Sequence, residues 1–213
     1  KCDWSSDGAL PIFNASALQG LRAARNVGRL MAEDLISAGI TANCVPVLDV
    51  PRPGAHEIVG NRAYSDRIEA IMALARAHAA GFADGGVLPV IKHIPGHGRA
   101  TADSHLALPR VTASVDELSA HDFVTFRGLN HAPLAMTAHV VYEAIDPQRP
   151  ATTSSKIIHR IIRGEIGFDG LLMSDDLSMA ALDGPFGERT KSALFAGCDI
   201  VLHCNGRLDE MRE

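Results

Sequence analysis

The chain has 213 residues, of which 46% are hydrophobic and 21% charged, and its formal net charge is −5 at pH 7. This composition excludes intrinsic disorder for most of the chain, and the scattered lysines and arginines exclude a polyanion-binding surface, so we expect no nucleic-acid partner. Because no run of about eighteen apolar residues occurs, we expect no membrane-spanning helix and no membrane partner. Residues 1–213 are expected to form a single domain.

Short apolar runs alternate with helical patterns along the chain. Residues 1–16 show no clear pattern, but Ser16 and Gln19 resemble a capping box that opens a helix ending at Gly39. The later helices are predicted to begin at 66, 114, 155 and 186. Strands are predicted at 40–48, 87–92, 134–141, 170–174 and 199–203. Because each of these runs is almost continuously apolar, the strands are expected to lie in a parallel sheet covered on both faces.

The alternation of strands and helices predicts an α/β fold, either an open doubly wound sheet or a (β/α)8 barrel. The first strand is followed by Asp49-Val50-Pro51-Arg52-Pro53-Gly54, which is not the glycine-rich turn of a nucleotide-binding sheet. Polar residues instead follow several different strands, as they do at the active-site end of a barrel. Since a full barrel needs about 250 residues and only five strands are predicted, we expect a (β/α)8 barrel with one or more units that lie outside this chain or are not recognised in its pattern.

The four cysteines are Cys2, Cys44, Cys198 and Cys204, and none of them forms a CxxC pair. Cys44 and Cys198 lie in apolar runs, which favours buried thiols over a disulfide framework. Reduced thiols are typical of a reducing compartment, so a cytoplasmic location is expected.

The densest group of polar residues directly follows the second predicted strand. Three interpretations fit it: a solvated loop, a zinc site, and a loop that binds sugar and transfers a proton. HExxH, the familiar zinc-protease pattern, is absent. Three histidines, a lysine and an aspartate would be costly in an apolar core. The segment reads Lys92-His93-Ile94-Pro95-Gly96-His97-Gly98-Arg99 and continues to Asp103-Ser104-His105.

Two adjacent carboxylates, Asp175 and Asp176, follow the fourth predicted strand. Since neighbouring side chains point to opposite sides, the two cannot share one role. One is expected to face the mouth of the barrel while the other caps the next helix, although both could be helix-entry caps. With an ordinary pKa of about 3.9, the carboxylate at the mouth would be ionised and able to act as a nucleophile.

Other polar residues carry weaker signals. Arg62 offers five fixed donors to hydroxyls or carboxylates. His139 at the third strand, and His203 with Asn205 after the fifth, fit a pocket lining and a hydrogen-bonded core equally well. Three further cations are interpreted as solvated charges: Arg189, Lys191 and Arg207.

Together these motifs resemble the β-N-acetylhexosaminidases of glycoside hydrolase family 3, the type that acts in bacterial cell-wall recycling. The resemblance covers about residues 17–213 and rests on the loop 91–98 and the segments 103–105, 136–139 and 174–179. It implies a TIM-type barrel in which Asp175 is the nucleophile and His105 the general acid/base, with Asp103 as its partner. Substrate-binding positions are implied at Arg62, Lys92, His93 and His139.

The implied substrate is a non-reducing terminal β-linked N-acetylglucosamine on an anhydro-muropeptide fragment. No metal, no other cofactor and a monomeric state are expected. The family's Asp-Gln-Glu-Gly-Gly-Arg segment is missing and would lie before residue 1, so the resemblance implies a TIM-type (β/α)8 barrel truncated at its N-terminus, and the end at Glu213 also comes early. Ile94 stands where the family commonly has Phe.

Alternative functions remain open from the sequence. A β-glucosidase or a glycoside phosphorylase could use the same fold, since a histidine acid does not repel phosphate. A zinc hydrolase could use His93, His97 and His105. A sugar-binding fragment without turnover would also fit the truncation.

Overall fold

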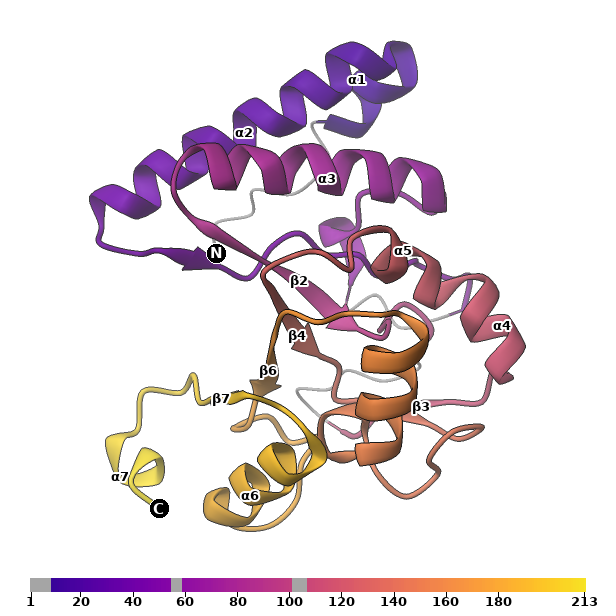
Figure 1. Ribbon diagram of the computed structural model, residues 1–213, viewed down its shortest axis with the longest axis vertical. Coiled ribbons are helices and arrows are strands. Elements are labelled where there is room, and N and C mark those ends of the chain that lie inside the picture. Colours follow the sequence, from indigo (N-terminus) through magenta and orange to yellow (C-terminus); the bar gives the residue numbers. More distant parts are fainter. Residues whose placement is uncertain (1–8, 55–58, 101–106) are drawn as a thin grey trace.

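The computed structural model describes residues 9–54, 59–100 and 107–213. Its centre is one parallel sheet whose five strands run in the order β1-β2-β4-β6-β7, and each of them lies within or overlaps a predicted run (Figure 1). Every new strand therefore joins the same growing edge, as expected when each crossover carries a helix. The strands are β1 (Ala42–Asn43), β2 (Leu88–Ile94), β4 (Leu134–Thr137), β6 (Leu171–Asp176) and β7 (Ile200–Leu202).

In the described residues the parallel sheet curls into a half-barrel, so the α/β fold class is confirmed, whereas a complete TIM-type barrel is not seen there. Within the described ranges, no strand connects β1 to β7, and these two strands are the edges of the sheet. A second, two-stranded parallel sheet, which the sequence analysis missed, pairs β3 (Arg110–Val111) with β5 (Val141–Tyr142).

Helices cover the convex side of the sheet, and several differ from the prediction. The third predicted helix is two helices, because the backbone at His121 leaves helical geometry. The capping box of Ser114 and Glu117 is confirmed, but α3 begins after Arg67, so Asp66 is not its cap. The elements are α1 (Ala9–Ala15), α2 (Ala17–Ser37), η2 (Gly60–Arg62), α3 (Ile68–Asp84), α4 (Val115–Ala120), α5 (Asp122–Gly128), η3 (Ala151–Thr153), the π-helix η4 (Ile157–Glu165), α6 (Phe186–Ala196) and α7 (Leu208–Met211). In the part of the chain that is described, none of these helices has the length and apolarity needed to cross a bilayer.

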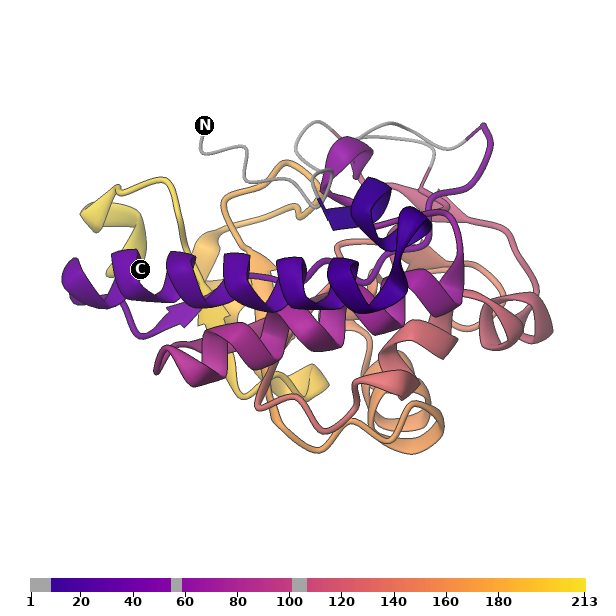
Figure 2. The same cartoon turned by 90° about the horizontal axis from the view of Figure 1, so that it is seen from above.

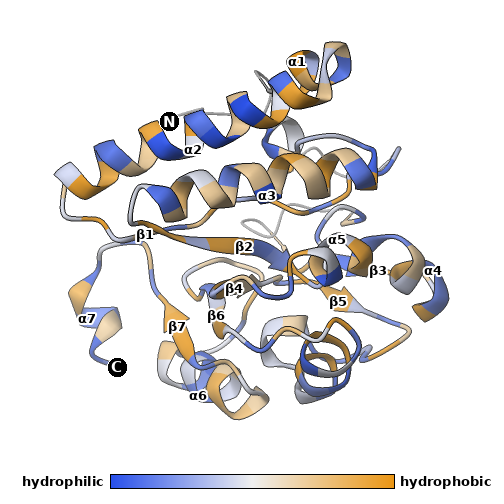
Figure 3. Ribbon diagram, turned by 45° about the horizontal axis from the view of Figure 1, so that its top comes forward, coloured by the Kyte–Doolittle hydropathy of each residue, from blue (hydrophilic) through white to orange (hydrophobic). Residues whose placement is uncertain are grey.

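The two faces of the sheet carry separate apolar clusters. Ile91, Ala135 and Leu172 belong to the main core, which lies between the sheet and its helices. Val90, Met136 and Met173, the alternate residues of the same strands, form a second cluster on the concave face. Figure 3 shows β2 as hydrophobic at its start and hydrophilic at its arrowhead, and β7 as hydrophobic. By the same alternation, Lys92 and Asp175 continue the concave face toward the carboxyl ends of the strands.

Helices α2 and α3 lie side by side along one flank of the molecule (Figure 2). Glycines permit this close approach: a Cβ on Gly81 would lie 2.0 Å from the carbonyl oxygen of Arg25, and one on Gly28 would lie 2.4 Å from that of His78. The backbones of the two helices therefore touch where these residues have no side chain.

Gly81→Ala is expected to lower the free energy of unfolding by about 1–3 kcal/mol, because the added methyl must push α2 away from α3. Urea unfolding followed by circular dichroism measures this change. Gly187→Ala in α6 is the matched control, since a Cβ there meets nothing nearer than 3.3 Å. An equal loss of stability in the two variants would contradict the packing argument.

A buried pair, Tyr64 and His78, joins the segment after η2 to helix α3. The Tyr64 hydroxyl and Nδ1 of His78 share a hydrogen bond, and the His78 ring packs against Phe82 with centroids 5.0 Å apart. Burial lowers the pKa of His78 to about 4 and raises that of Tyr64. The folded protein therefore keeps this histidine neutral.

The unfolding free energy is expected to fall as the pH drops from about 6.5 to about 4. In this range the histidines bind protons in the unfolded chain but stay neutral where they are buried in the folded protein. Each such histidine contributes about 1.4 kcal/mol per pH unit across this window. His97, whose pKa burial also lowers to about 4, adds a second proton. Urea titrations at several pH values should show that His78→Gln removes about one proton from this dependence. An unchanged slope in the variant would contradict the assignment.

Candidate active site

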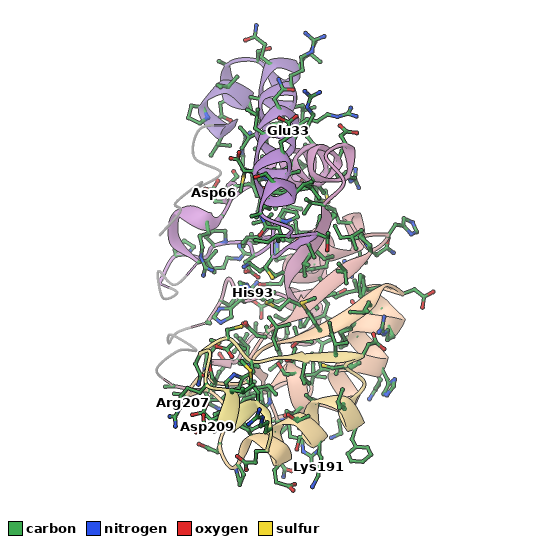
Figure 4. The ribbon with its side chains drawn as sticks, turned by 90° about the vertical axis from the view of Figure 1, so that its left-hand side faces the viewer. Glu33, Asp66, His93, Lys191, Arg207 and Asp209 are labelled. Carbon is green, nitrogen blue, oxygen red and sulfur yellow. The ribbon has the colours of Figure 1, made fainter. Side chains whose placement is uncertain are left out.

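Polar side chains from four neighbouring segments converge at the carboxyl ends of the strands. Lys92 and His93 end β2, Asp175 lies near the end of β6, and His139 follows β4 by two residues. Asp49 comes from the segment after β1, which joins the sheet where Val47 bridges Lys92. In parallel sheets these ends lie at one edge. In Figure 4, His93 lies at mid-height, between the α2–α3 pair above and α6 below.

An irregularity in β2 determines how His93 is aimed. The register between β2 and β4 shifts between Lys92 and Ile94. In a regular strand, neighbouring residues would point to opposite faces of the sheet, and a bulge re-aims a side chain locally. Consecutive residues can thus both contribute to the site.

The Asp175 carboxylate is half-buried and has charged neighbours. Burial alone would raise the pKa of this carboxyl, but its neighbours outweigh that effect and hold the pKa below its ordinary value, with the largest contributions from His93 and His139. The backbone N–H of Asp176 donates to Oδ1 over 2.8 Å, and the ammonium of Lys92 acts in the same direction. The carboxylate is therefore ionised at neutral pH, as a nucleophile requires.

Asp176 plays a different part, as the sequence analysis expected of one member of the pair. Its Oδ1 accepts from the backbone N–H groups of Ser178 and Cys204, at 2.9 and 3.0 Å, and its Oδ2 accepts from the Ser178 hydroxyl at 2.6 Å. The residue caps a turn rather than a helix, and it ties β6 to the segment after β7. The interpretation that both carboxylates cap a helix is wrong.

Lys92 is surrounded by groups that act on it in opposite directions. Burial lowers the pKa of its ammonium, as does the positive charge of Arg62, while Cys44, Asp175 and Asp49 counteract this. The structure thus brings Lys92 close to both Arg62 and Asp175. Cys44 is half-buried rather than buried, whereas Cys198 is buried as expected.

Asp49 is completely buried, with 0% exposure, and was not singled out from the sequence. Its Oδ2 lies 2.7 Å from Nδ1 of His93, and its Oδ1 accepts from the backbone N–H groups of His97 and His93 at 2.6 and 3.3 Å. Burial alone would raise the pKa of this carboxyl, but His93 and His97 outweigh that effect and hold it low. The sequence signal that could have identified Asp49 as a site residue is its position directly after the apolar run of the first predicted strand.

His139 is fully buried, and both of its ring nitrogens have partners. Nδ1 lies 2.7 Å from the hydroxyl of Thr152, and Nε2 lies 3.0 Å from the carbonyl oxygen of Asp176. Since a carbonyl only accepts, Nε2 carries the proton. Burial lowers the pKa of the ring, which favours its neutral form. His139 is thus held through both ring nitrogens, one of them bonded to the residue that follows Asp175.

The remaining candidates are two residues that are not described and three that bond elsewhere. Asp103 and His105 lie outside the described residues. His203 and Asn205 both form hydrogen bonds to Glu210, at 3.0 and 2.6 Å, and not to Asp175. Arg189 was wrongly interpreted as solvated, because it donates to three carbonyl oxygens of the loop after Asp176: Leu177, Met179 and Gly184.

No group of three or more His, Cys, Asp or Glu side chains suited to a metal ion occurs in the described part of the chain. His93 and His97 pack edge to face, with ring centroids 5.6 Å apart. The third member of the zinc alternative, His105, is not among the described residues, so the relative placement of those three histidines is not described. The described residues bring together an ionised carboxylate, two histidines and a lysine that lower its pKa, a setting that suits a nucleophilic carboxylate.

Comparisons with known proteins agree with this chemistry. Residues 6–213 match the Glycosyl hydrolase family 3 N terminal domain. A beta-hexosaminidase of Alkalilimnicola ehrlichii is 43% identical over 198 residues, which cover 91% of this chain and 56% of that relative. A beta-hexosaminidase of Neisseria gonorrhoeae is 42% identical in an alignment 216 residues long, which covers 99% of this chain and 57% of that relative. The chain therefore spans a little more than half the length of these curated relatives.

A solved structure shares the fold. NagZ from Neisseria gonorrhoeae, in complex with N-trifluoroacetyl-D-glucosamine, matches with a TM-score of 0.89 and 39% sequence identity. The match covers 98% of this chain and 60% of that one. Nearly the whole half-barrel thus has a counterpart in a larger molecule with a sugar derivative bound.

Proposed function

Because the chain belongs to the glycosyl hydrolase family 3 N-terminal domain family, we propose that it acts as a retaining exo-β-N-acetylglucosaminidase. Its substrate is a non-reducing terminal β-linked N-acetylglucosamine on a peptidoglycan fragment of the anhydro-muropeptide type. The observation that carries the proposal is the setting of Asp175, an ionised carboxylate beside His93, His139 and Lys92. A relative with an N-acylated glucosamine bound supports the choice of sugar.

In the first step, a carboxylate oxygen of Asp175 attacks the anomeric carbon and the bond from that carbon to the aglycone oxygen breaks. His105 gives its proton to the departing oxygen, and Asp103 stabilises the imidazolium form that donates it. In the second step, a water molecule attacks the same carbon while His105 takes back a proton. The ester to Asp175 breaks and the product keeps the β configuration.

Three side chains are assigned to the sugar. Arg62 and Lys92, which are close enough for Arg62 to lower the pKa of Lys92, donate to hydroxyl oxygens, and His93 completes the set. His139 orients the segment that carries the nucleophile, since its Nε2 donates to the carbonyl oxygen of Asp176.

A slow donor tests the proposal directly. A 5-fluoro N-acetylglucosaminyl fluoride should add the mass of one sugar to the intact protein, and the label should map to the peptide that contains Asp175. No label, or a label on another residue, would contradict the nucleophile. An α-configured product would contradict retention.

Product analysis separates the alternatives. With phosphate present, free N-acetylglucosamine supports hydrolysis, whereas the sugar 1-phosphate would make the protein a phosphorylase. Loss of activity with a chelator, restored by zinc, would favour the zinc hydrolase. Faster turnover of β-glucosides than of N-acetylglucosaminides would make it a β-glucosidase, and binding without any turnover would leave a sugar-binding protein.

A further inference from the structure

Asp49 is a fully buried carboxylate with no lysine or arginine among its described hydrogen-bond partners. Its described partners are the ring Nδ1 of His93 and the backbone N–H groups of His93 and His97. A buried carboxylate needs hydrogen-bond donors. Asp49 accepts from His93 and His97, and it thereby holds the end of β2 and the loop that follows it. The hydrogen bond between Asp49 and His93 is a tertiary contact, because it joins residues that are 44 positions apart in the sequence.

The contact fixes which nitrogen of His93 carries the proton. Oδ2 of Asp49 is an ionised oxygen that only accepts, so the Nδ1 atom 2.7 Å away donates. In a neutral ring, Nε2 then has a free lone pair. Among the described residues, no hydrogen-bond partner of Nε2 is present, so this nitrogen is left for a ligand.

The next residue in the chain has the opposite capacity. Lys92 offers only donors, and it carries no hydrogen bond from its ammonium to the described part of the protein. A sugar hydroxyl both accepts and donates, so it can accept from Lys92 while donating to Nε2 of His93. A fluorine atom in place of that hydroxyl could accept only, and a hydrogen atom could do neither.

We propose that Asp49 is a positioning residue that holds His93 in the Nδ1–H form, so that Lys92 and His93 together recognise one hydroxyl group of the substrate as both acceptor and donor. The proposal rests on the proposed function for the identity of the ligand as a sugar. The protonation pattern of the ring does not rest on it.

Nitrogen NMR of the ¹⁵N-histidine-labelled protein at pH 7.5 tests the ring without any substrate. His93→Gln identifies the His93 signals by their loss. In the wild type, Nδ1 should be protonated and Nε2 should have the shift of a bare imine nitrogen. An Nε2–H ring, or a doubly protonated one, would overturn the proposal, and this measurement decides it even if Asp49→Asn fails to fold.

Asp49→Asn supplies the matching change. The amide can donate to Nδ1, which should shift the proton to Nε2, and circular dichroism checks that the variant is folded. Asp146→Asn is the control, because Asp146 is also a buried carboxylate but bonds to the Ser154 hydroxyl, at 2.6 Å, and not to a histidine. A folded Asp49→Asn protein with an unchanged His93 ring would overturn the proposal.

Kinetics then connect the ring to recognition. Asp49→Asn should lower kcat/KM by about 10- to 100-fold, as the loss of a residue that orients a ligating histidine does. It should cost nothing further in the His93→Gln background. Substrates with fluorine in place of single hydroxyl groups identify the recognised position. Fluorination at that position should lower kcat/KM, relative to the unfluorinated substrate, by a larger factor in the wild type than in Asp49→Asn. Additive losses in the double variant would overturn the proposal, whereas a wild type without turnover contradicts only the proposed function.

Discussion

Asp175→Ala is expected to lower kcat/KM by on the order of 10⁴-fold or more, because no other group can form the bond to the anomeric carbon. The loss should be similar for aryl glycosides and for sugar aglycones, since both need the same nucleophile. Initial rates with a p-nitrophenyl glycoside measure it, and the sugar label of the trapping experiment should vanish as well.

Azide provides the matching control. In Asp175→Ala, the missing side chain leaves room for a small anion to attack the same carbon, which should restore turnover and give an α-glycosyl azide. Asp176→Asn tests whether loss of a negative charge in this segment is by itself enough to lower kcat/KM. It should mainly lower the free energy of unfolding, by about 1–3 kcal/mol. A larger rate loss in Asp176→Asn than in Asp175→Ala would exchange the roles of the two residues.

His105→Ala is expected to lower kcat/KM by about 10²–10⁴-fold on a substrate with a sugar aglycone, the usual contribution of a general acid. An aryl leaving group departs with little protonation, so on such a substrate the loss in kcat/KM should be much smaller. The comparison of the two substrates in one variant is the measurement. Losses of similar size for His105→Ala and Asp175→Ala on the aryl glycoside would contradict both assignments.

The strands could be predicted from the sequence because their apolar runs are almost continuous. The inner strands β2, β4 and β6 are mostly buried as expected, whereas the edge strands β1 and β7 are exposed or partly exposed. The division between Asp175 and Asp176 was predictable for a similar reason, since alternation along a strand sends neighbours in opposite directions. Helix starts were less predictable. Ser114 and Glu117 form the box that their spacing indicates, but Asp66 does not cap α3.

What could not be predicted depends on contacts between distant parts of the chain. Asp49 looks like any polar residue after a strand, and only the folded loop brings it to His93. Arg189 looks solvated until the turn after β6 places carbonyl oxygens around it. The break at His121 and the π-helical geometry of η4 likewise lie outside simple periodicity. Curvature of the sheet depends on all strands together, so an open half-barrel and a closed barrel share the same local pattern.

The hydrogen bonds of Asp176 have a consequence for large-scale mutagenesis. The residue secures a turn, the segment after β7 and, through its carbonyl oxygen, the ring of His139. A growth-based scan would thus record nearly every change at 175 and at 176 as harmful, although for different reasons. Only a parallel readout of protein abundance would separate them, with variants at 176 depleted from the cell and those at 175 present but silent.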